Sequence, residues 1–323
     1  MNRFISVVTS FHSDAHKEKI NAAAEKLGFS VRYFASDAEA ESSIHESEIL
    51  FSHSSPDLLK KAENLKWFCC DFAGVDKYQD PAVFCREDCL LTNSSGAYGI
   101  AIAEHLIMVS LMLTHRYFDY QPCVTDGRWG TDDIPIRSII GSTITVLGTG
   151  DIGTEFARRA KALGAKCVRG VHRSASPIDA AFDENCTQAQ LDSLLPDTDL
   201  LIMCLPSTPD TVGILSRERI AMLPRHACVC NVGRGTAIDQ EALMDALHDG
   251  RIAGAALDVV VPEPIPEGHP LLKTPNLIIT PHCAGNMALD YTCHKVVDMF
   301  LEDLAHYAAG EKLTYLVNRK VGY

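Results

Sequence analysis

Short apolar runs alternate with segments of helix-forming residues along the whole chain. In the first hundred residues the apolar runs cover residues 4–9, 31–35, 48–52, 67–72 and 89–92. Helical segments lie between them, for example residues 15–27, which stop at Gly28, and residues 56–62. Because parallel strands are connected by helical crossovers, this alternation predicts an α/β fold with a parallel sheet.

A long apolar helix is predicted next, followed by a segment without a clear period. Ile102, Leu106, Val109 and Leu113 recur at helical spacing, which predicts one helix over residues 101–114. Residues 117–136 mix proline, glycine, tryptophan and charged residues. We expect an irregular arm or a long loop there.

A second alternation of apolar runs and helical segments begins at residue 142. Strands are expected over residues 143–147, 167–171, 200–205, 227–231, 254–259 and 277–280. Helices are expected over residues 154–163, 240–248 and 291–308. Since both parts of the chain follow the same α/β pattern, the sequence predicts two related domains, each with a parallel sheet.

Composition and charge exclude some classes of protein, such as nucleic-acid-binding and membrane-spanning proteins. The 323 residues include 29 Lys and Arg against 42 Asp and Glu, a net charge of −13, which argues against nucleic acid or an anionic membrane as partner. No apolar run approaches the ~20 residues that span a bilayer, and the N-terminus lacks a signal-peptide pattern. We therefore expect a cytoplasmic protein with no membrane contact.

The sequence offers little support for a metal centre. The 12 cysteines are scattered and contain no Cys-x-x-Cys pair, so we interpret them as reduced, mostly buried small hydrophobic residues. His12 and His16 have the i, i+4 spacing of a metal site, but Ser13 and Asp14 beside them are typical of a helix N-cap. We predict no bound metal.

The segment Gly148-Thr-Gly150-Asp151-Ile152-Gly153 follows a predicted strand and opens a predicted helix. In a dinucleotide-binding loop the first glycine makes a tight turn, and the second lets the backbone approach a pyrophosphate. The third lets the helix pack on the strand, and the helix N-terminus offers N–H donors to the phosphates. We predict a nucleotide cofactor here; the alternative is an ordinary tight turn.

The end of the next strand bears on the choice between NADP and NAD. An acidic residue there would bind the ribose 2′-hydroxyl of NAD, but this chain has His172, Arg173 and Ser174. Arg173 can pair with a 2′-phosphate, Ser174 can donate to it and His172 can assist. The sequence favours NADP, and NAD remains possible if Arg173 is only a solvated surface charge.

Several motifs in the second half occur together and in order. They are Asn231-Val-Gly-Arg-Gly235, Gly254-Ala-Ala-Leu-Asp258, Pro262-Glu263-Pro264 and Thr280-Pro-His282. Upstream lie Phe72-Ala-Gly-Val-Asp76, Asn93-Ser-Ser-Gly96 and Leu205-Pro206. With these motifs the chain resembles, over essentially its whole length, the D-isomer-specific 2-hydroxyacid dehydrogenase family, which includes glyoxylate and hydroxypyruvate reductases.

The chemistry of the matching residues agrees with this resemblance. Reduction of a 2-oxo acid requires a cation for the carboxylate and a proton donor for the carbonyl oxygen. Arg234 offers a planar guanidinium fork, and the imidazole of His282 can donate a proton. Glu263 can hydrogen-bond the second imidazole nitrogen and orient the ring. The resemblance implies these three as the catalytic residues.

The resemblance also implies binding roles. Asp258 matches the acidic residue beside the nicotinamide ribose, and Ala73, Gly74 and Val75 match the loop whose backbone N–H groups bind the substrate carboxylate together with Arg234. The positions expected to line the cofactor are Leu205, Pro206, Val232 and Gly233. The chain departs from the family at Val261, where an acidic residue is common, and at Ile100 and Ala101, which lack the usual proline.

The family further implies a discontinuous substrate domain. Residues 1–98 plus 287–323 would form a flavodoxin-like domain, and residues 99–286 a Rossmann domain, with the active site between the two. The long helix and the following arm resemble the family's dimer contact, which predicts a homodimer. The implied activity is NAD(P)H-dependent reduction of a small 2-oxo acid, such as glyoxylate or hydroxypyruvate, to the D-2-hydroxy acid.

Two other functions fit the same sequence. One is an NAD-linked dehydrogenase that oxidises a D-2-hydroxy acid, although the absence of a carboxylate after Val171 speaks against it. The other is a non-enzymatic, cofactor-sensing protein of corepressor type, because a fold does not determine function. The presence of Arg234, Glu263 and His282 favours an enzyme.

Overall fold

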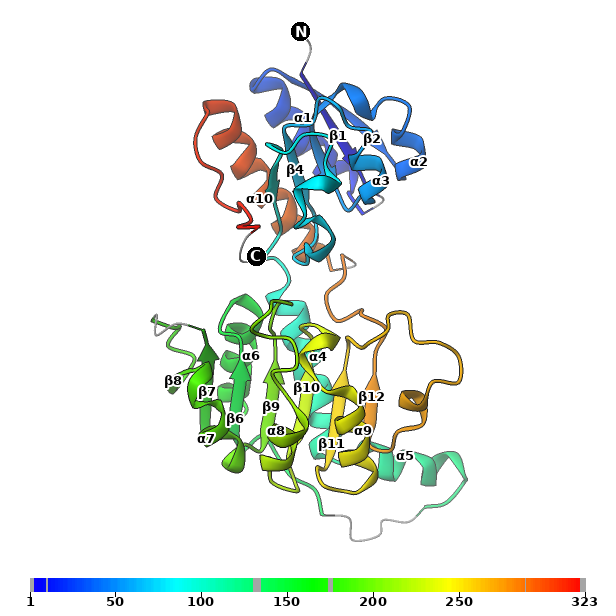
Figure 1. Ribbon diagram of the computed structural model, residues 1–323, viewed down its shortest axis with the longest axis vertical. Coiled ribbons are helices and arrows are strands. Elements are labelled where there is room, and N and C mark those ends of the chain that lie inside the picture. Colours follow the sequence, from blue (N-terminus) through cyan, green and yellow to red (C-terminus); the bar gives the residue numbers. More distant parts are fainter. Residues whose placement is uncertain (1–2, 10, 130–134, 174–176, 288, 320–323) are drawn as a thin grey trace. The chain divides into compact units, whose positions relative to one another are not determined.

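The computed structural model describes residues 3–9, 11–129, 135–173, 177–287 and 289–319 (Figure 1). The chain folds into two compact units. Unit 1 comprises Met1–Tyr98 and Asn286–Tyr323, and unit 2 comprises Gly99–Gly285. The chain therefore leaves unit 1 once and returns to it. Asn286, which the sequence prediction placed in the middle domain, groups with unit 1.

Unit 1 contains a five-stranded parallel sheet. Its strands are β1 (Arg3–Val8), β2 (Phe29–Phe34), β3 (Ser47–Ser52), β4 (Trp67–Cys70) and β5 (Leu90–Thr92). They lie in the order β2-β1-β3-β4-β5, and every neighbouring pair is parallel. This is the strand order of the flavodoxin-like fold. The predicted α/β class with parallel sheets is confirmed for this unit.

The helices of unit 1 are α1 (Asp14–Lys26), α2 (Asp37–Ala40), α3 (Pro56–Leu59) and α10 (Asp290–Ala309). Helix α10 comes from the far end of the chain and joins this unit through aromatic packing. The ring of Phe300 on α10 stacks on Phe51 of β3, with centroids 4.3 Å apart, and on Trp67 of β4. Such large buried rings contribute much of the packing energy of a core.

Unit 2 contains a seven-stranded sheet. Its strands are β6 (Thr143–Leu147), β7 (Cys167–His172), β8 (Glu184–Thr187), β9 (Leu200–Met203), β10 (Cys228–Asn231), β11 (Gly254–Leu257) and β12 (Leu277–Ile279). The order is β12-β11-β10-β9-β6-β7-β8, and all neighbours are parallel. Strand β8 was not predicted, because its sequence Glu-Asn-Cys-Thr carries no apolar run.

The helices of unit 2 are α4 (Gly99–Thr114), α5 (Tyr117–Thr125), α6 (Asp151–Ala162), α7 (Leu191–Leu194), α8 (Arg217–Met222) and α9 (Gln240–His248). No range was predicted for α7 and α8, and α4 begins two residues earlier than predicted. Helices α5 and α6 also differ from the prediction. A helix, α5, occupies part of the segment expected to be irregular; Pro122 lies in its second turn and removes one internal hydrogen bond. Helix α6 begins at Asp151 rather than Thr154.

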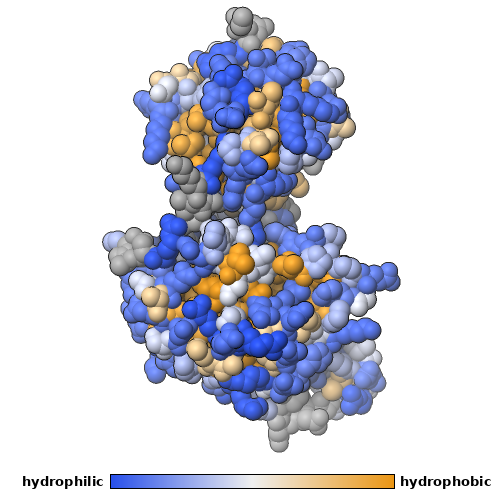
Figure 2. Space-filling view, viewed as in Figure 1, coloured by the Kyte–Doolittle hydropathy of each residue, from blue (hydrophilic) through white to orange (hydrophobic). Residues whose placement is uncertain are grey.

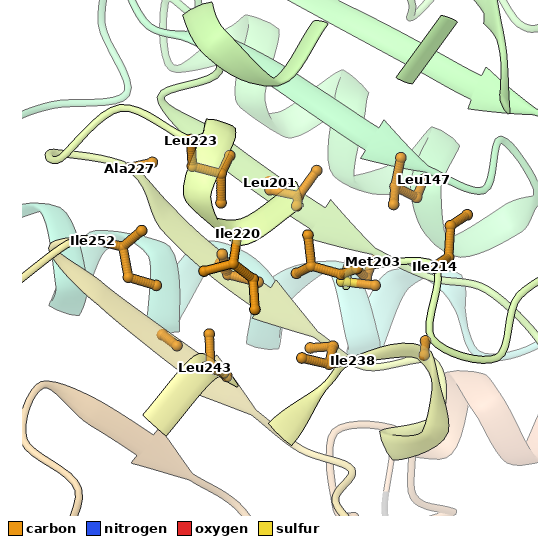
Figure 3. Packing of buried hydrophobic residues seen from close by; sticks show 14 of the residues in the cluster. Leu147, Leu201, Met203, Ile214, Ile220, Leu223, Ala227, Ile238, Leu243 and Ile252 are labelled. Atoms are coloured by element: carbon orange, nitrogen blue, oxygen red, sulfur yellow. The ribbon is translucent and has the colours of Figure 1, made fainter. Parts of the chain in front are cut away.

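The sheet of unit 2 is covered on both faces, as parallel sheets are. Leu201 and Leu243 belong to one apolar cluster with Ile220 of α8, which fills the face shown in Figure 3. Helix α4 contacts β10 and β11, and its Ser110 hydroxyl lies 3.8 Å from the Cys230 sulfur. Because side chains alternate along a strand, consecutive residues of β10 supply both layers of the core.

On the face shown in Figure 2, hydrophilic residues predominate and hydrophobic residues gather in separate patches. Among the described helices, none combines the length and the apolar character that crossing a membrane requires.

The strand order of unit 2 also locates its ligand-binding edge. From β6 the chain builds outward through β7 and β8 on one side, and through β9 to β12 on the other. The switch in direction therefore falls between β6 and β9. In open parallel sheets, ligands bind beyond the carboxyl ends of the strands at such a switch point. This edge of unit 2 is where the predicted cofactor and catalytic residues should lie.

Candidate active site

The predicted residues of unit 2 follow the carboxyl ends of neighbouring strands. The glycine loop follows β6, and Leu205 and Pro206 follow β9. Val232, Gly233 and Arg234 follow β10, Asp258 follows β11, and His282 lies three residues beyond β12. Because all these strands are parallel neighbours in one sheet, their carboxyl ends share one edge. The fold thus gathers residues that lie far apart in the sequence.

The glycine loop has the shape of a phosphate cradle. Gly148 has φ +101°, and a Cβ there would lie 2.8 Å from the Cys204 carbonyl oxygen. A Cβ on Gly153 would lie 2.0 Å from the Gly148 carbonyl oxygen, whereas at Gly150 no described atom lies within 4 Å. The first and third glycines are therefore needed for packing, and the second leaves open space at the N-terminus of α6. These residues fit a dinucleotide pyrophosphate.

The two residues between the second and third glycines lie in the first turn of α6. The Asp151 Oδ2 atom accepts a hydrogen bond from the backbone N–H of Gly99, at 2.7 Å. A side chain on Gly99 would collide with that carboxylate. Asp151 thus joins the start of α6 to the start of α4. The cofactor-binding roles predicted for Asp151 and Ile152 stay predictions.

The residues at the end of β7 concern the choice of cofactor. His172 is the last residue of β7, and its Nε2 atom lies 2.5 Å from the Asn185 Oδ1 atom on the neighbouring strand β8. Arg173 follows directly, and Ser174 lies outside the described residues. This strand end therefore presents a cation and an imidazole, and the 2′-phosphate contacts of Arg173 and Ser174 stay predictions.

The loop after β10 holds Arg234 in a fixed backbone conformation. The Asn231 side chain accepts from the Gly233 N–H at 3.0 Å and donates to the Arg234 carbonyl at 2.9 Å. A Cβ on Gly233 would lie 2.4 Å from the Leu205 carbonyl oxygen, so the loops after β9 and β10 pack backbone against backbone. Val232 is buried, and its N–H bonds to Met203 of β9. The sequence motif is explained by this tight packing.

His282 and Glu263 lie together, as the motif chemistry predicts. The His282 Nδ1 atom lies 2.8 Å from Glu263 Oε2, and Glu263 Oε1 accepts from the backbone N–H of Val260 at 2.8 Å. His282 has φ +51°, a left-handed conformation that is uncommon for a residue with a side chain. Its side chain is half exposed. The ring is thus oriented by a carboxylate while remaining accessible.

Asp258 is hydrogen-bonded to the loop that carries His282. It is buried, and its Oδ1 atom accepts from the Thr280 hydroxyl at 2.5 Å and from the Cys283 N–H at 2.9 Å. The Oδ2 atom accepts from the Ala284 N–H, and the Asp258 carbonyl accepts from the His282 N–H. The carboxylate therefore organises the loop that carries His282. Contact with the nicotinamide ribose stays a prediction.

Thr280 and His105 contribute to this region although the sequence did not predict a role for either. The Thr280 hydroxyl donates to Asp258 and lies 3.3 Å from the His105 Nε2 atom on helix α4. Desolvation lowers the pKa of His105, so its ring is neutral at neutral pH. The motif Thr280-Pro-His282 carried the signal for Thr280, but only the tertiary structure places His105 beside it.

The predicted substrate loop, Ala73 to Val75, belongs to unit 1. It follows β4, and the Asn93 side chain donates to the Ala73 carbonyl at 2.7 Å. Val75 is buried in the core of this unit. The loop is therefore held from both ends, with Gly74 between the two anchored residues. Binding of a substrate carboxylate by its backbone stays a prediction.

Comparison with known proteins shows the class to which this chain belongs. The sequence model of a protein family, the NAD-binding domain of D-isomer-specific 2-hydroxyacid dehydrogenases, matches residues 107–284. A glyoxylate reductase of Korarchaeum cryptofilum is 31% identical over 72% of this chain and 70% of its own. The chain belongs to the D-isomer-specific 2-hydroxyacid dehydrogenase family, as the motifs predicted.

Solved structures resemble the whole chain. A D-isomer-specific 2-hydroxyacid dehydrogenase family protein of Aeromonas salmonicida has 31% identity and a TM-score of 0.86, with 99% of this chain and 100% of that chain covered. An NADPH-dependent glyoxylate/hydroxypyruvate reductase of Sinorhizobium meliloti, in complex with NADP and sulfate, has 26% identity and a TM-score of 0.82, with both chains covered completely. The protein is an oxidoreductase of the class that reduces 2-oxo acids with a nicotinamide cofactor.

Proposed function

We propose that this protein is an NADPH-dependent reductase that converts a small 2-oxo acid, of the glyoxylate or hydroxypyruvate type, to the D-2-hydroxy acid. The observation that carries the proposal is the hydrogen bond between His282 and Glu263, at the same sheet edge as Arg234 and the glycine loop. A proton donor, a cation and a phosphate cradle are the groups that this reaction requires.

Arg234 binds the substrate in this proposal. Its guanidinium group has the planar geometry for a bidentate pair with a carboxylate, and it can also polarise the neighbouring carbonyl oxygen. The packing of Gly233 against Leu205 restricts where the Arg234 backbone can move. The backbone N–H groups of Ala73, Gly74 and Val75 are proposed to bind the same carboxylate.

His282 acts as the general acid. When bound, the nicotinamide cofactor supplies a hydride to the carbonyl carbon. The proton that the carbonyl oxygen gains comes from Nε2 of His282, while Nδ1 stays hydrogen-bonded to Glu263. The carboxylate stabilises the imidazolium before proton transfer and orients the ring throughout.

The choice of NADPH rests on the end of β7. Arg173 supplies a positive charge there, and His172 supplies an imidazole. Neither residue offers the carboxylate that would bind the ribose of NAD. Support comes from the relatives crystallised with NADP or NADPH, from Sinorhizobium meliloti and from Xanthobacter autotrophicus. The binding roles of Leu205, Pro206, Val232 and Gly233 around the cofactor belong to the same proposal.

The cofactor preference is tested with kcat/KM for NADPH and NADH. We expect the wild type to prefer NADPH, and Arg173→Ala to lower kcat/KM for NADPH by about 10- to 100-fold, since a charge-assisted hydrogen bond contributes about 1.5–3 kcal/mol. NADH kinetics should change little. Arg217→Ala, on the exposed face of α8, is the matched control. A wild-type preference for NADH would contradict the proposal.

The reaction is tested by following NADPH oxidation with a panel of small 2-oxo acids. His282→Gln should lower kcat by about 10²- to 10⁴-fold, the usual contribution of general acid catalysis. Glu263→Gln should lower kcat and also change its pH profile. His248→Gln, an exposed histidine on α9, should have wild-type activity.

The alternatives are separated by the same assays. Faster oxidation of D-2-hydroxy acids with NAD than reduction with NADPH would support the NAD-linked dehydrogenase. Protein that binds NADPH but turns over no 2-oxo acid would support a cofactor-sensing binding protein.

A further inference from the structure

Three potential metal ligands of unit 1 meet at the carboxyl ends of two neighbouring strands. His53 follows β3, Cys70 is the last residue of β4, and Asp71 comes directly after it. The strands are parallel, with Ser52 paired to Cys70. His53 and Cys70 are 17 residues apart, a separation that no short metal-binding motif covers. The sheet pairing alone brings the three side chains together.

The distances among these side chains suit ligands that share one ion. The His53 Nδ1 atom lies 3.8 Å from the Cys70 sulfur and 3.9 Å from Asp71 Oδ1, and all three ligand atoms lie within 4.8 Å of one another. A nitrogen–oxygen distance of 3.9 Å is too long for a hydrogen bond. Two ligands of a tetrahedral zinc ion, each about 2.0–2.3 Å from the metal, lie roughly 3.3–3.8 Å apart. Binding one ion would therefore draw His53 slightly closer to Asp71.

The Asp71 carboxylate supplies an independent indication of a ligand. Asp71 is 2% exposed, and its Oδ1 atom has no hydrogen-bond partner among the described residues. Leaving a buried polar atom without a partner costs about 1–3 kcal/mol, so such atoms are rare in folded proteins. This oxygen is the one that lies 3.9 Å from the His53 Nδ1 atom. A bound cation would give it the partner that the described residues do not supply.

We propose that His53, Cys70 and Asp71 form a binding site for a divalent transition-metal ion, of which Zn²⁺ is the best match. A thiolate, an imidazole and a carboxylate are all zinc ligands, and the thiolate disfavours Mg²⁺ and Ca²⁺, which bind oxygen. On binding, the Cys70 thiol releases its proton to solvent, as thiol ligands do. Three protein ligands leave a fourth position for water.

Lys77 is the neighbouring charge that the site has to accommodate. Its Nζ atom lies 3.2 Å from the His53 Nε2 atom. Coordination through Nδ1 places the imidazole proton on Nε2, which then cannot accept a hydrogen bond from Lys77. Lys77 is exposed, so its flexible side chain can turn to solvent. The bound ion would join the ends of β3 and β4 immediately before the loop Ala73 to Val75.

Cobalt(II) provides a direct test, because a cysteine ligand gives it a sulfur-to-metal charge-transfer absorption. The chelator-treated full-length protein is titrated with Co²⁺ and then with Zn²⁺. We expect a charge-transfer band that saturates at one equivalent of Co²⁺ and disappears when Zn²⁺ is added. Zn²⁺ affinity is measured separately by competition with a chromophoric chelator.

Variants distinguish this site from other thiols. Cys70→Ser should abolish the charge-transfer band, and His53→Gln, at an exposed position, should weaken Zn²⁺ binding by at least about tenfold. Cys69→Ser, at the adjacent buried cysteine of β4, is the matched control and should retain both signals. Absence of the band in the wild type, or unchanged metal binding in both Cys70→Ser and His53→Gln, would overturn the proposal.

Discussion

At the residue scale, buried polar side chains differ in whether the fold supplies them with partners. Asp258 accepts three hydrogen bonds through its carboxylate. His12 is 6% exposed, and neither of its ring nitrogens has a hydrogen-bond partner among the described residues. Burial lowers the pKa of His12 to about 4, and the positive charges of His16 and Lys17 add to the effect. His12 therefore stays neutral inside unit 1.

The buried neutral state of His12 predicts a pH-dependent loss of stability. Between its ordinary pKa of 6.5 and the folded value of about 4, the unfolded chain binds a proton that the folded chain does not. This histidine therefore lowers the free energy of unfolding as the pH falls through that range. We expect His12→Leu to remove about 2 kcal/mol of this acid sensitivity between pH 7 and pH 5.

Urea unfolding at about pH 7 and about pH 5 measures the effect as the difference between variant and wild type. The difference is needed because other groups of the protein titrate in the same pH range and contribute equally to variant and wild type. His45→Gln, at an exposed position, serves as control. If the free energy of unfolding depends on pH equally in His12→Leu and in the wild type, the prediction is contradicted.

At the element scale, hydrogen bonds join the loops that follow β11 and β12. Asp258 comes directly after β11, and its carboxylate bonds to Thr280, Cys283 and Ala284 beyond β12. The same contacts hold His282 in its left-handed backbone conformation. The loop is thus positioned by a buried charge rather than by regular secondary structure.

Asp258→Asn should weaken this positioning. The amide cannot accept on both sides, so we expect a loss of about 1–3 kcal/mol in the free energy of unfolding and a lower kcat. If Asp258 acts by positioning His282, the KM for NADPH should change little, and Thr280→Val should shift kcat in the same direction. A rise in the NADPH KM in Asp258→Asn alone would instead indicate direct contact with the cofactor. Unfolding curves and steady-state kinetics provide the measurements.

At the scale of the whole molecule, unit 2 carries an exposed apolar surface on consecutive helices. Met108 of α4 is 48% exposed, and on α5 the exposed fractions are 48% for Tyr117, 41% for Phe118 and 63% for Val124. Several large, exposed apolar side chains on neighbouring helices are typical of protein–protein contacts. The family resemblance predicts a dimer through these same helices.

We therefore expect a homodimer of 2 × 35.3 kDa in solution. Phe118→Glu should shift the protein toward the monomer, because a buried unpaired charge destabilises an interface. Phe11→Glu, at an exposed phenylalanine of unit 1, is the matched control and should leave the dimer intact. Sedimentation equilibrium or light scattering gives the mass; a monomeric wild type would contradict the prediction.

Most strands and long helices could be predicted because their apolar periodicity is local. Strand β6 and helix α9 have the predicted bounds. The edge strand β8 was not predicted because it lacks an apolar run. Helix α5 was not predicted because it contains Pro122, a residue that usually ends helices. The start of α6 at Asp151 was missed since the glycine loop continues into the helix.

The sequence by itself determined the α/β class and the glycine loop, because these depend on local periodicity and spacing. Its resemblance to the family implied roles for Arg234, Glu263 and His282. The tertiary structure decided which partners those residues have. It turned the Asp258 carboxylate onto the loop of His282, and it brought His53 beside Cys70 and Asp71. The physical reason is strand pairing: neighbours in a parallel sheet are connected through long crossovers, so their juxtaposed ends leave no signal in sequence spacing.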